Sequence, residues 1–202
     1  MHPNADKLRD ISAKKSAKRQ EKKDAIALSA IEALKALGYA NTTLRDIAAN
    51  SDLSLGMLHY YFEDKTQLVI HCVHMYKVGF IADIDAAIAA ADDGAAFAEV
   101  FAGGLADAVV DNWAHHRLWY DIRAQAMFDE SFRNAVNGIE AELIAVLARA
   151  AVRFESPADV ELGYAALDGL FRYFTQGCAM GAPRPRAEIA AAFARLLARL
   201  AG

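Results

Sequence analysis

The sequence predicts an all-α fold, and three observations support this prediction. The helix-breaking residue proline is absent between residues 4 and 156 of the 202-residue chain, so long helices are permitted there. Runs that alternate β-branched and polar residues, which are typical of strands, are missing. Hydrophobic residues make up 55% of the chain, enough for a sizeable core. We therefore expect an N-terminal three-helix unit followed by a longer helical domain.

The first helix is expected over residues 20–37. Its apolar residues recur at helical spacing and form one stripe: Ile26, Ala30, Ala33, Leu34 and Leu37. Gly38 follows directly and is a natural residue to end the helix, because glycine adopts the left-handed conformation easily.

Residues 42–65 predict two short helices joined by a tight turn, and then the start of a third helix. Thr43 and Asp46 have the spacing of a capping box, in which each side chain caps the backbone of the other. Residues 50–52, Asn-Ser-Asp, interrupt the helical pattern, and Ser54 is a good N-cap for a second helix over 55–61.

The second short helix has two different faces. Leu58 and Phe62 are four residues apart and are expected to face the core. The remaining large side chains are expected to look outward: Leu55, Met57, His59 and Tyr60. A soluble protein rarely exposes such a row without a partner.

This stretch resembles the DNA-binding domain of the tetracycline-repressor (TetR) family of transcription regulators. The residues that carry the resemblance lie between Ile26 and Leu68: Gly38-Tyr39, Thr42-Thr43, Asp46-Ile47-Ala48, Ser54, Gly56, Leu58, Tyr60, Phe62 and Lys65. The family pattern has glycine, threonine and tyrosine where this chain has Asp52, Met57 and His59, so no operator sequence can be transferred from a relative. The resemblance implies a helix-turn-helix whose second helix enters the major groove. The expected DNA-binding residues are Thr43, Arg45, Ser54, Leu55, Gly56, Met57, His59, Tyr60 and Lys65.

The net charge of −4 is unfavourable for binding DNA, but the distribution of charge along the chain is compatible with it. Residues 1–65 carry 11 basic and 9 acidic residues, whereas the remainder carries 11 basic and 17 acidic residues. Residues 1–19 form a basic arm that could neutralise phosphates or lie in a minor groove. The alternative is a merely solvated tail.

The rest of the chain predicts further helices over 65–91, 95–113, 116–128, 131–152, 157–180 and 186–201. We expect Ser156 to cap the helix that begins at Pro157. His71, Cys72 and His74 are adjacent on one helix, but no further ligand is indicated, so no metal site is expected. No cofactor is expected either.

The aromatic composition of the second half predicts a helical bundle with an internal cavity for an apolar or aromatic small molecule. The candidate lining residues are Trp113, Trp119, Tyr120, Phe128, Tyr164, Phe171 and Phe174. His115, Arg123 and Gln125 could supply polar contacts, and Arg123 would leave room for a carboxylate. Ordinary aromatic core is the alternative for each of these residues.

The last two helices are expected to pair with their copies in a homodimer. Their apolar residues lie at helical spacing and form the expected interface: Leu167, Leu170, Phe171, Phe174, Ile189, Phe193, Leu196, Leu197 and Leu200.

The family resemblance implies a ligand-responsive regulator, and we expect a repressor that a small molecule releases from a palindromic operator. The expected domains are a basic arm (1–19), a helix-turn-helix domain (20–66) and an effector-binding and dimerisation domain (67–202). No apolar run is long enough to span a bilayer, and two unpaired cysteines favour a cytoplasmic protein. The alternatives are an activator, a regulator without a ligand, and less favourably an enzyme or scaffold. Enzyme motifs such as G-x-S-x-G, the P-loop and H-E-x-x-H are missing.

Overall fold

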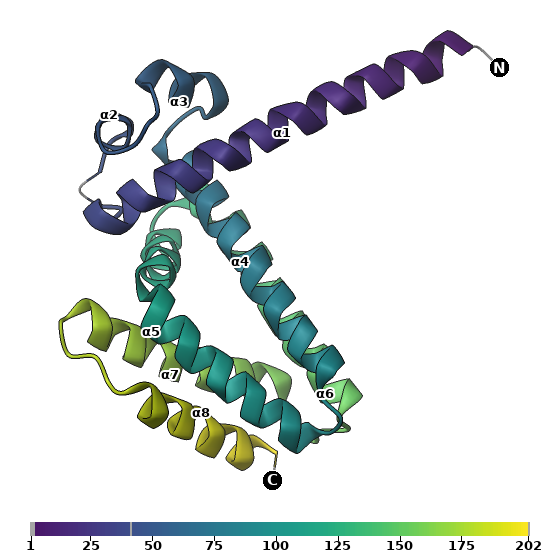
Figure 1. Ribbon diagram of the computed structural model, residues 1–202, viewed down its shortest axis with the longest axis vertical. Coiled ribbons are helices and arrows are strands. Elements are labelled where there is room, and N and C mark those ends of the chain that lie inside the picture. Colours follow the sequence, from purple (N-terminus) through teal and green to yellow (C-terminus); the bar gives the residue numbers. More distant parts are fainter. Residues whose placement is uncertain (1–2, 41, 202) are drawn as a thin grey trace. The chain divides into compact units, whose positions relative to one another are not determined.

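The computed structural model describes the backbone of residues 3–40 and 42–201, and the side chains of residues 13–40 and 42–201. Within these ranges the chain contains helices and no strand, which confirms the predicted all-α fold. The helices are α1 (Pro3–Leu37), α2 (Leu44–Ala49), α3 (Leu55–Tyr61), α4 (Lys65–Ala90), α5 (Gly94–Ala126), α6 (Glu130–Arg153), α7 (Val160–Ala179) and α8 (Arg186–Leu200) (Figure 1). They divide into two compact units, Met1–Met75 and Tyr76–Gly202, and α4 contributes residues to both.

The first unit is a three-helix domain closed by the start of α4. Its core consists of apolar residues that are almost completely buried, including Ile26, Leu34, Ile47, Leu58, Phe62 and Leu68. Two polar contacts join α4 to α1. The Cys72 thiol donates to the Ala27 carbonyl at 3.4 Å, and His71 Nε2 lies 2.8 Å from Asp24 Oδ1.

Helix α1 is much longer than predicted, because it begins at Pro3 rather than at residue 20. Residues 4–37 contain neither proline nor glycine and are rich in alanine, lysine and other good helix formers, so nothing in the basic segment ends the helix. The described part of the segment predicted as an arm is therefore helical, while residues 1 and 2 lie outside the described residues. Gly38 ends the helix with φ 77°, as its sequence position predicts.

The second unit is a bundle in which α5 packs against α6, α7 and α8 (Figure 1). Apolar side chains from all these helices form one core, including Phe101, Val109, Val146, Phe171 and Phe193. The second half of α4 is tied to α6 by an ion pair in which Arg149 Nη2 lies 2.7 Å from Asp85 Oδ2.

Two predicted helix boundaries in this bundle are wrong. The helices expected over 95–113 and 116–128 are one helix, α5, with a kink at Asn112 (φ −125°, ψ 16°). The helix expected from Pro157 begins at Val160, and its N-cap is Asp159 rather than Ser156. Asp159 Oδ1 accepts from the Leu162 amide at 3.0 Å, whereas the Ser156 hydroxyl accepts from Ala158 within the preceding loop. Asp159 is the residue placed to reach the third amide of the helix.

Candidate nucleic-acid interface and ligand cavity

The N-terminus of α2 is held by the predicted capping box. The Asp46 amide donates to Thr43 Oγ1 at 3.2 Å, and the Thr43 amide donates to Asp46 Oδ2 at 2.8 Å. Hydrogen bonds from the Thr43 hydroxyl and amide hold the pKa of Asp46 below its ordinary value. Thr43 itself is exposed, so the start of α2 is both rigid and accessible.

Helix α3 presents the two faces that the sequence predicts. Ser54 Oγ accepts from the Met57 amide at 3.1 Å and caps the helix. Leu58 is fully buried and Phe62, the C-cap residue, is 1% exposed. The residues of the outward row are half-buried or exposed, and Tyr60 is 68% exposed.

The outward face of α3 lies beside the basic part of α1. The Arg19 guanidinium lies 5.5 Å from the ring centroids of both Tyr60 and Tyr61. The neighbouring basic residues of α1 are largely exposed: Lys14, Lys15, Lys18, Lys22 and the half-buried Lys23. An apolar and aromatic row next to several cations is suited to a duplex, whose base edges lie between lines of phosphates.

Lys65 has a structural role that the sequence did not indicate. Its ammonium group donates to the Tyr39 carbonyl at 2.9 Å and lies 4.0 Å from the centroid of the Tyr39 ring. Partial burial lowers the pKa of Lys65. This lysine therefore fastens the beginning of α4 to the turn after α1, and any phosphate contact must share the same ammonium group.

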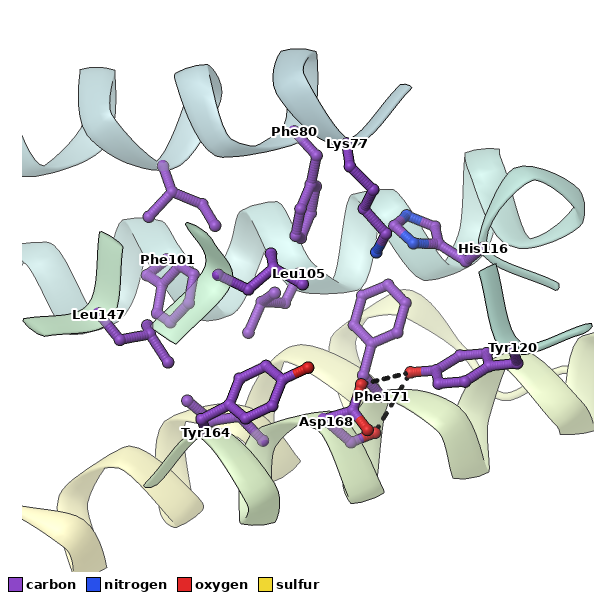
Figure 2. Close-up of a pocket in the computed structure, with 13 residues that line it drawn as sticks. Lys77, Phe80, Phe101, Leu105, His116, Tyr120, Leu147, Tyr164, Asp168 and Phe171 are labelled. Atoms are coloured by element: carbon purple, nitrogen blue, oxygen red, sulfur yellow. Dashed lines mark hydrogen bonds between the residues drawn. The ribbon is translucent and has the colours of Figure 1, made fainter. Parts of the chain in front are cut away.

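The second unit contains a cavity of about 50 Å³ with a mostly apolar wall (Figure 2). Three of the predicted lining residues take part: Tyr120, Tyr164 and Phe171. The other candidates do not line it: Trp113, His115, Trp119, Arg123, Gln125, Phe128 and Phe174. Phe128 follows the end of α5 and is 84% exposed, so it faces solvent and not the cavity.

Arg123 is already committed to two carboxylates of the protein. Its guanidinium donates to Asp168 Oδ2 and to Glu140 Oε1, each at 2.6 Å. Burial is the largest single effect and lowers the pKa of Arg123, but the hydrogen bond to Asp168 and the charges of Asp168, Tyr164 and Glu140 together outweigh it, so the net shift is upward. The expectation that Arg123 leaves room for a ligand carboxylate is therefore wrong, because both ends of the guanidinium are used.

Lys77 and His116 are polar residues of the cavity that sequence reasoning missed. Lys77 is 4% exposed and His116 is fully buried, and their side chains lie next to each other at the cavity (Figure 2). Burial lowers the pKa of Lys77 to about 7. Burial, and then the charge of Lys77, hold the pKa of His116 well below its usual range. The sequence does contain a signal for Lys77: it is the last lysine of the chain and lies between Tyr76 and Phe80 on an apolar helix face.

A second cavity, of about 280 Å³, lies next to the first. Phe101, Leu147 and Leu167 line both cavities. The other apolar walls of the second cavity include Phe97, Phe154, Leu197 and Leu200.

Most of the residues predicted to face a second copy of the chain lie inside their own unit. Ile189 and Phe193 are 0% exposed, and Leu167, Phe171 and Phe174 are also buried. Leu170, Leu196, Leu197 and Leu200 are half-buried against the same core. What α7 and α8 turn outward is a groove of about 420 Å³ lined by Tyr173, Phe174, Arg184, Ala187, Glu188, Ala191, Ala192 and Arg195. The apolar spacing of these helices thus serves the bundle itself.

The described residues contain no group of three or more histidine, cysteine or acidic side chains placed to hold a metal ion. Of the adjacent residues His71, Cys72 and His74, the first two contact α1 and the third is exposed. None of the helices in the described ranges combines the length and apolar character that crossing a membrane requires.

Comparison with known proteins agrees with this geometry. Residues 26–72 match the family model described as bacterial regulatory proteins, tetR family. No curated protein matches the chain.

Several solved structures share the fold over most of the chain. The transcriptional regulator FadR from Bacillus subtilis, in complex with stearoyl-CoA, aligns with a TM-score of 0.68 and 16% identity over 88% of this chain and 96% of its own. A bacterial regulatory protein in the tetR family from Rhodococcus RHA1 aligns with a TM-score of 0.65 and 24% identity, over 90% and 97%. A TetR family transcription regulator from Marinobacter aquaeolei VT8 gives a TM-score of 0.69 and 16% identity, over 92% and 98%.

Proposed function

This chain belongs to the tetR family of bacterial regulatory proteins, and we propose that it is a homodimeric repressor which a small apolar effector releases from its operator. As a member of that family it is a DNA-binding transcriptional regulator. The observation that carries the proposal is the outward row of α3, which is held on a capped helix-turn-helix beside exposed cations.

The DNA contacts divide into two kinds. Met57 and His59 are placed on the outward side of α3, so we assign base contacts in the major groove to them. Leu55 and Gly56 begin the same helix, and a side chain added at Gly56 would meet nothing within 4 Å, which leaves room for close approach of a duplex. Phosphate contacts go to Thr43, Arg45, Ser54, Tyr60 and Lys65.

The effector acts on the second unit. Its cavity is bounded by Lys77, Phe80 and Ile84 of α4, and the first turn of that same helix contains Lys65. A ligand that displaces these side chains changes the helix that also supports the DNA-binding unit. Only differential affinity shifts such an equilibrium, so the effector binds the free protein more tightly than the DNA-bound protein, and DNA weakens the effector by the same factor.

The dimer joins the outward faces of α7 and α8 of two copies, with Tyr173 and Ala191 among the contacts. Two copies related by a two-fold axis would place two α3 helices on successive major grooves, about 34–36 Å apart. The operator is then a palindrome.

The test is selection of bound duplexes from a random pool, followed by titration of the selected sequence with the purified chain. We expect a palindromic site bound at nanomolar concentration, with affinity that falls steeply with salt. If the selected duplexes show no sequence enriched over the random pool, the proposal is contradicted.

A further inference from the structure

We propose that the effector is an apolar acid, whose carboxylate binds the Lys77 ammonium group and whose hydrocarbon body fills the cavity. This inference rests on the proposed function, since it names the chemical class of that effector. The carboxylate site itself can be tested without DNA.

Lys77 is a charged group of this cavity that has no hydrogen-bond or ion-pair partner. In the described part of the chain, no hydrogen bond or ion pair reaches its ammonium group, although the residue is only 4% exposed. The ammonium nitrogen lies 5.1 Å from the centroids of both Phe80 and Trp119, and the charge of Asp168 acts on it without forming an ion pair. A buried ammonium group without a hydrogen bond or ion pair is costly, and an anion placed beside it removes most of that cost.

The two tyrosine hydroxyls at the cavity wall are already in use as donors. The Tyr120 hydroxyl donates to Asp168 Oδ1 at 3.1 Å, and the Tyr164 hydroxyl donates to Glu140 Oε1 at 3.3 Å. Asp168 also accepts from Arg123. A ligand with acceptor oxygens is therefore directed to Lys77, and a ligand that needs an acceptor finds the Asp168 oxygens occupied (Figure 2).

His116 strengthens the choice of an acceptor. Its Nε2 is hydrogen bonded to the Tyr76 hydroxyl, while its buried Nδ1 has no partner. When Tyr76 donates to Nε2, the neutral ring carries its proton on Nδ1, so the side chain next to Lys77 has a second unused donor. A carboxylate has two oxygens and can accept from both.

The sizes of the cavities indicate the shape of the molecule. The cavity at Lys77 is about 50 Å³ and suits a headgroup, whereas the neighbouring cavity of about 280 Å³ is close to the lower end of ordinary ligand pockets. Phe101, Leu147 and Leu167 line both, so a body that displaces these apolar side chains extends from one cavity into the other.

The experiment compares carboxylates with their uncharged methyl esters. Octanoate, dodecanoate and naphthoate, and the three matching esters, are titrated into the wild-type protein, with tryptophan fluorescence as the readout because Trp119 lies beside Lys77. We expect at least one carboxylate to bind about tenfold or more tightly than its ester, the effect of one charge-assisted hydrogen bond. In Lys77→Met this preference disappears while the ester still binds.

The matched control is Lys35→Met, which makes the same substitution at a half-buried lysine of α1 that is ion-paired with Glu32 and does not line the cavity, and which should keep the wild-type preference for carboxylates. A second measurement needs no variant. Calorimetry of the wild type near its Lys77 pKa, in two buffers of different ionisation enthalpy, should reveal net proton uptake on carboxylate binding, because the anion stabilises the charged lysine. The other charged and titratable groups at the cavity wall, or bound to it, are His116, Tyr120, Arg123, Glu140, Tyr164 and Asp168. Both buffers are set to the same pH, so the comparison reports only protons exchanged on binding.

Equal affinity for acid and ester, the same preference in Lys77→Met, or no binding of any carboxylate would each overturn the inference. A repetition with saturating operator separates the two proposals. If carboxylates bind through Lys77 with an affinity that saturating operator does not change, the carboxylate site is supported and release of the operator by an effector is contradicted.

Discussion

At the scale of single residues, the unpaired Lys77 makes a prediction about stability and pH. Its pKa is about 7 in the folded chain, against an ordinary value of 10.5, so between these values the unfolded chain binds more protons than the folded one. The free energy of unfolding therefore rises with pH in this window, by up to about 1.4 kcal/mol per unit for this group. Lys77→Met lacks this dependence and should be more stable than the wild type at about pH 6.5, with a gap that narrows toward about pH 9.5. Denaturant titrations of both proteins across this range measure the gap; a gap independent of pH would contradict the assigned burial.

Lys65 gives a second prediction at this scale, because one ammonium group has two assigned roles. Lys65→Met removes the hydrogen bond to the Tyr39 carbonyl, which should lower the free energy of unfolding by about 1 kcal/mol. It should also weaken binding to every duplex equally and lessen the slope of log affinity against log salt by about one unit. Anisotropy at several salt concentrations, on protein shown to be folded, separates these effects. Altered sequence preference with an unchanged slope would mean that Lys65 does not bind phosphate.

At the scale of elements, α3 should determine which sequence is bound. Met57→Ala and His59→Ala remove side chains that face away from the core, so the fold should keep its stability to within about 0.5 kcal/mol. Each should cost about 1–3 kcal/mol on the selected operator and relax preference at one base position in each half-site. Selection experiments repeated with each variant identify those positions, and Lys35→Met is again the control. If a variant loses the same affinity for every duplex, its side chain contacts phosphate and not a base.

At the scale of the whole molecule, the outward groove of α7 and α8 should hold the dimer together. Ala191→Glu places a charge in that groove, twice in a symmetric dimer, and should raise the dissociation constant about a hundredfold or more. Ala141→Glu puts the same side chain on an exposed site of α6 and is the matched control. Sedimentation at micromolar concentration should give a dimer for the wild type and the control, and a monomer for Ala191→Glu. A wild-type monomer would exclude the interface.

The distance along the chain between contacting residues decides what the sequence can predict. The helix-turn-helix depends on contacts within three or four residues, such as the capping box of Thr43 and Asp46, so the local pattern was sufficient. The cavity depends on distant contacts, since the partners of Arg123 come from residues 140 and 168. Helical spacing alone also cannot distinguish an apolar stripe that fills its own bundle from one that meets a second chain. The spacing therefore predicts Ile189 and Phe193 at the dimer interface, although both are buried within their own unit.

The sharing of Arg123 between Asp168 and Glu140 has a consequence for how this cavity can diverge in evolution. Loss of the guanidinium first would leave two half-buried carboxylates without their shared ion-pair partner, a step that destabilises the bundle. Loss of Glu140 first leaves a neutral pair, from which Arg123 and Asp168 can be replaced with less harm. Descendants that recognise different molecules should therefore have changed these three positions in a preferred order, and reconstructed ancestors would reveal it.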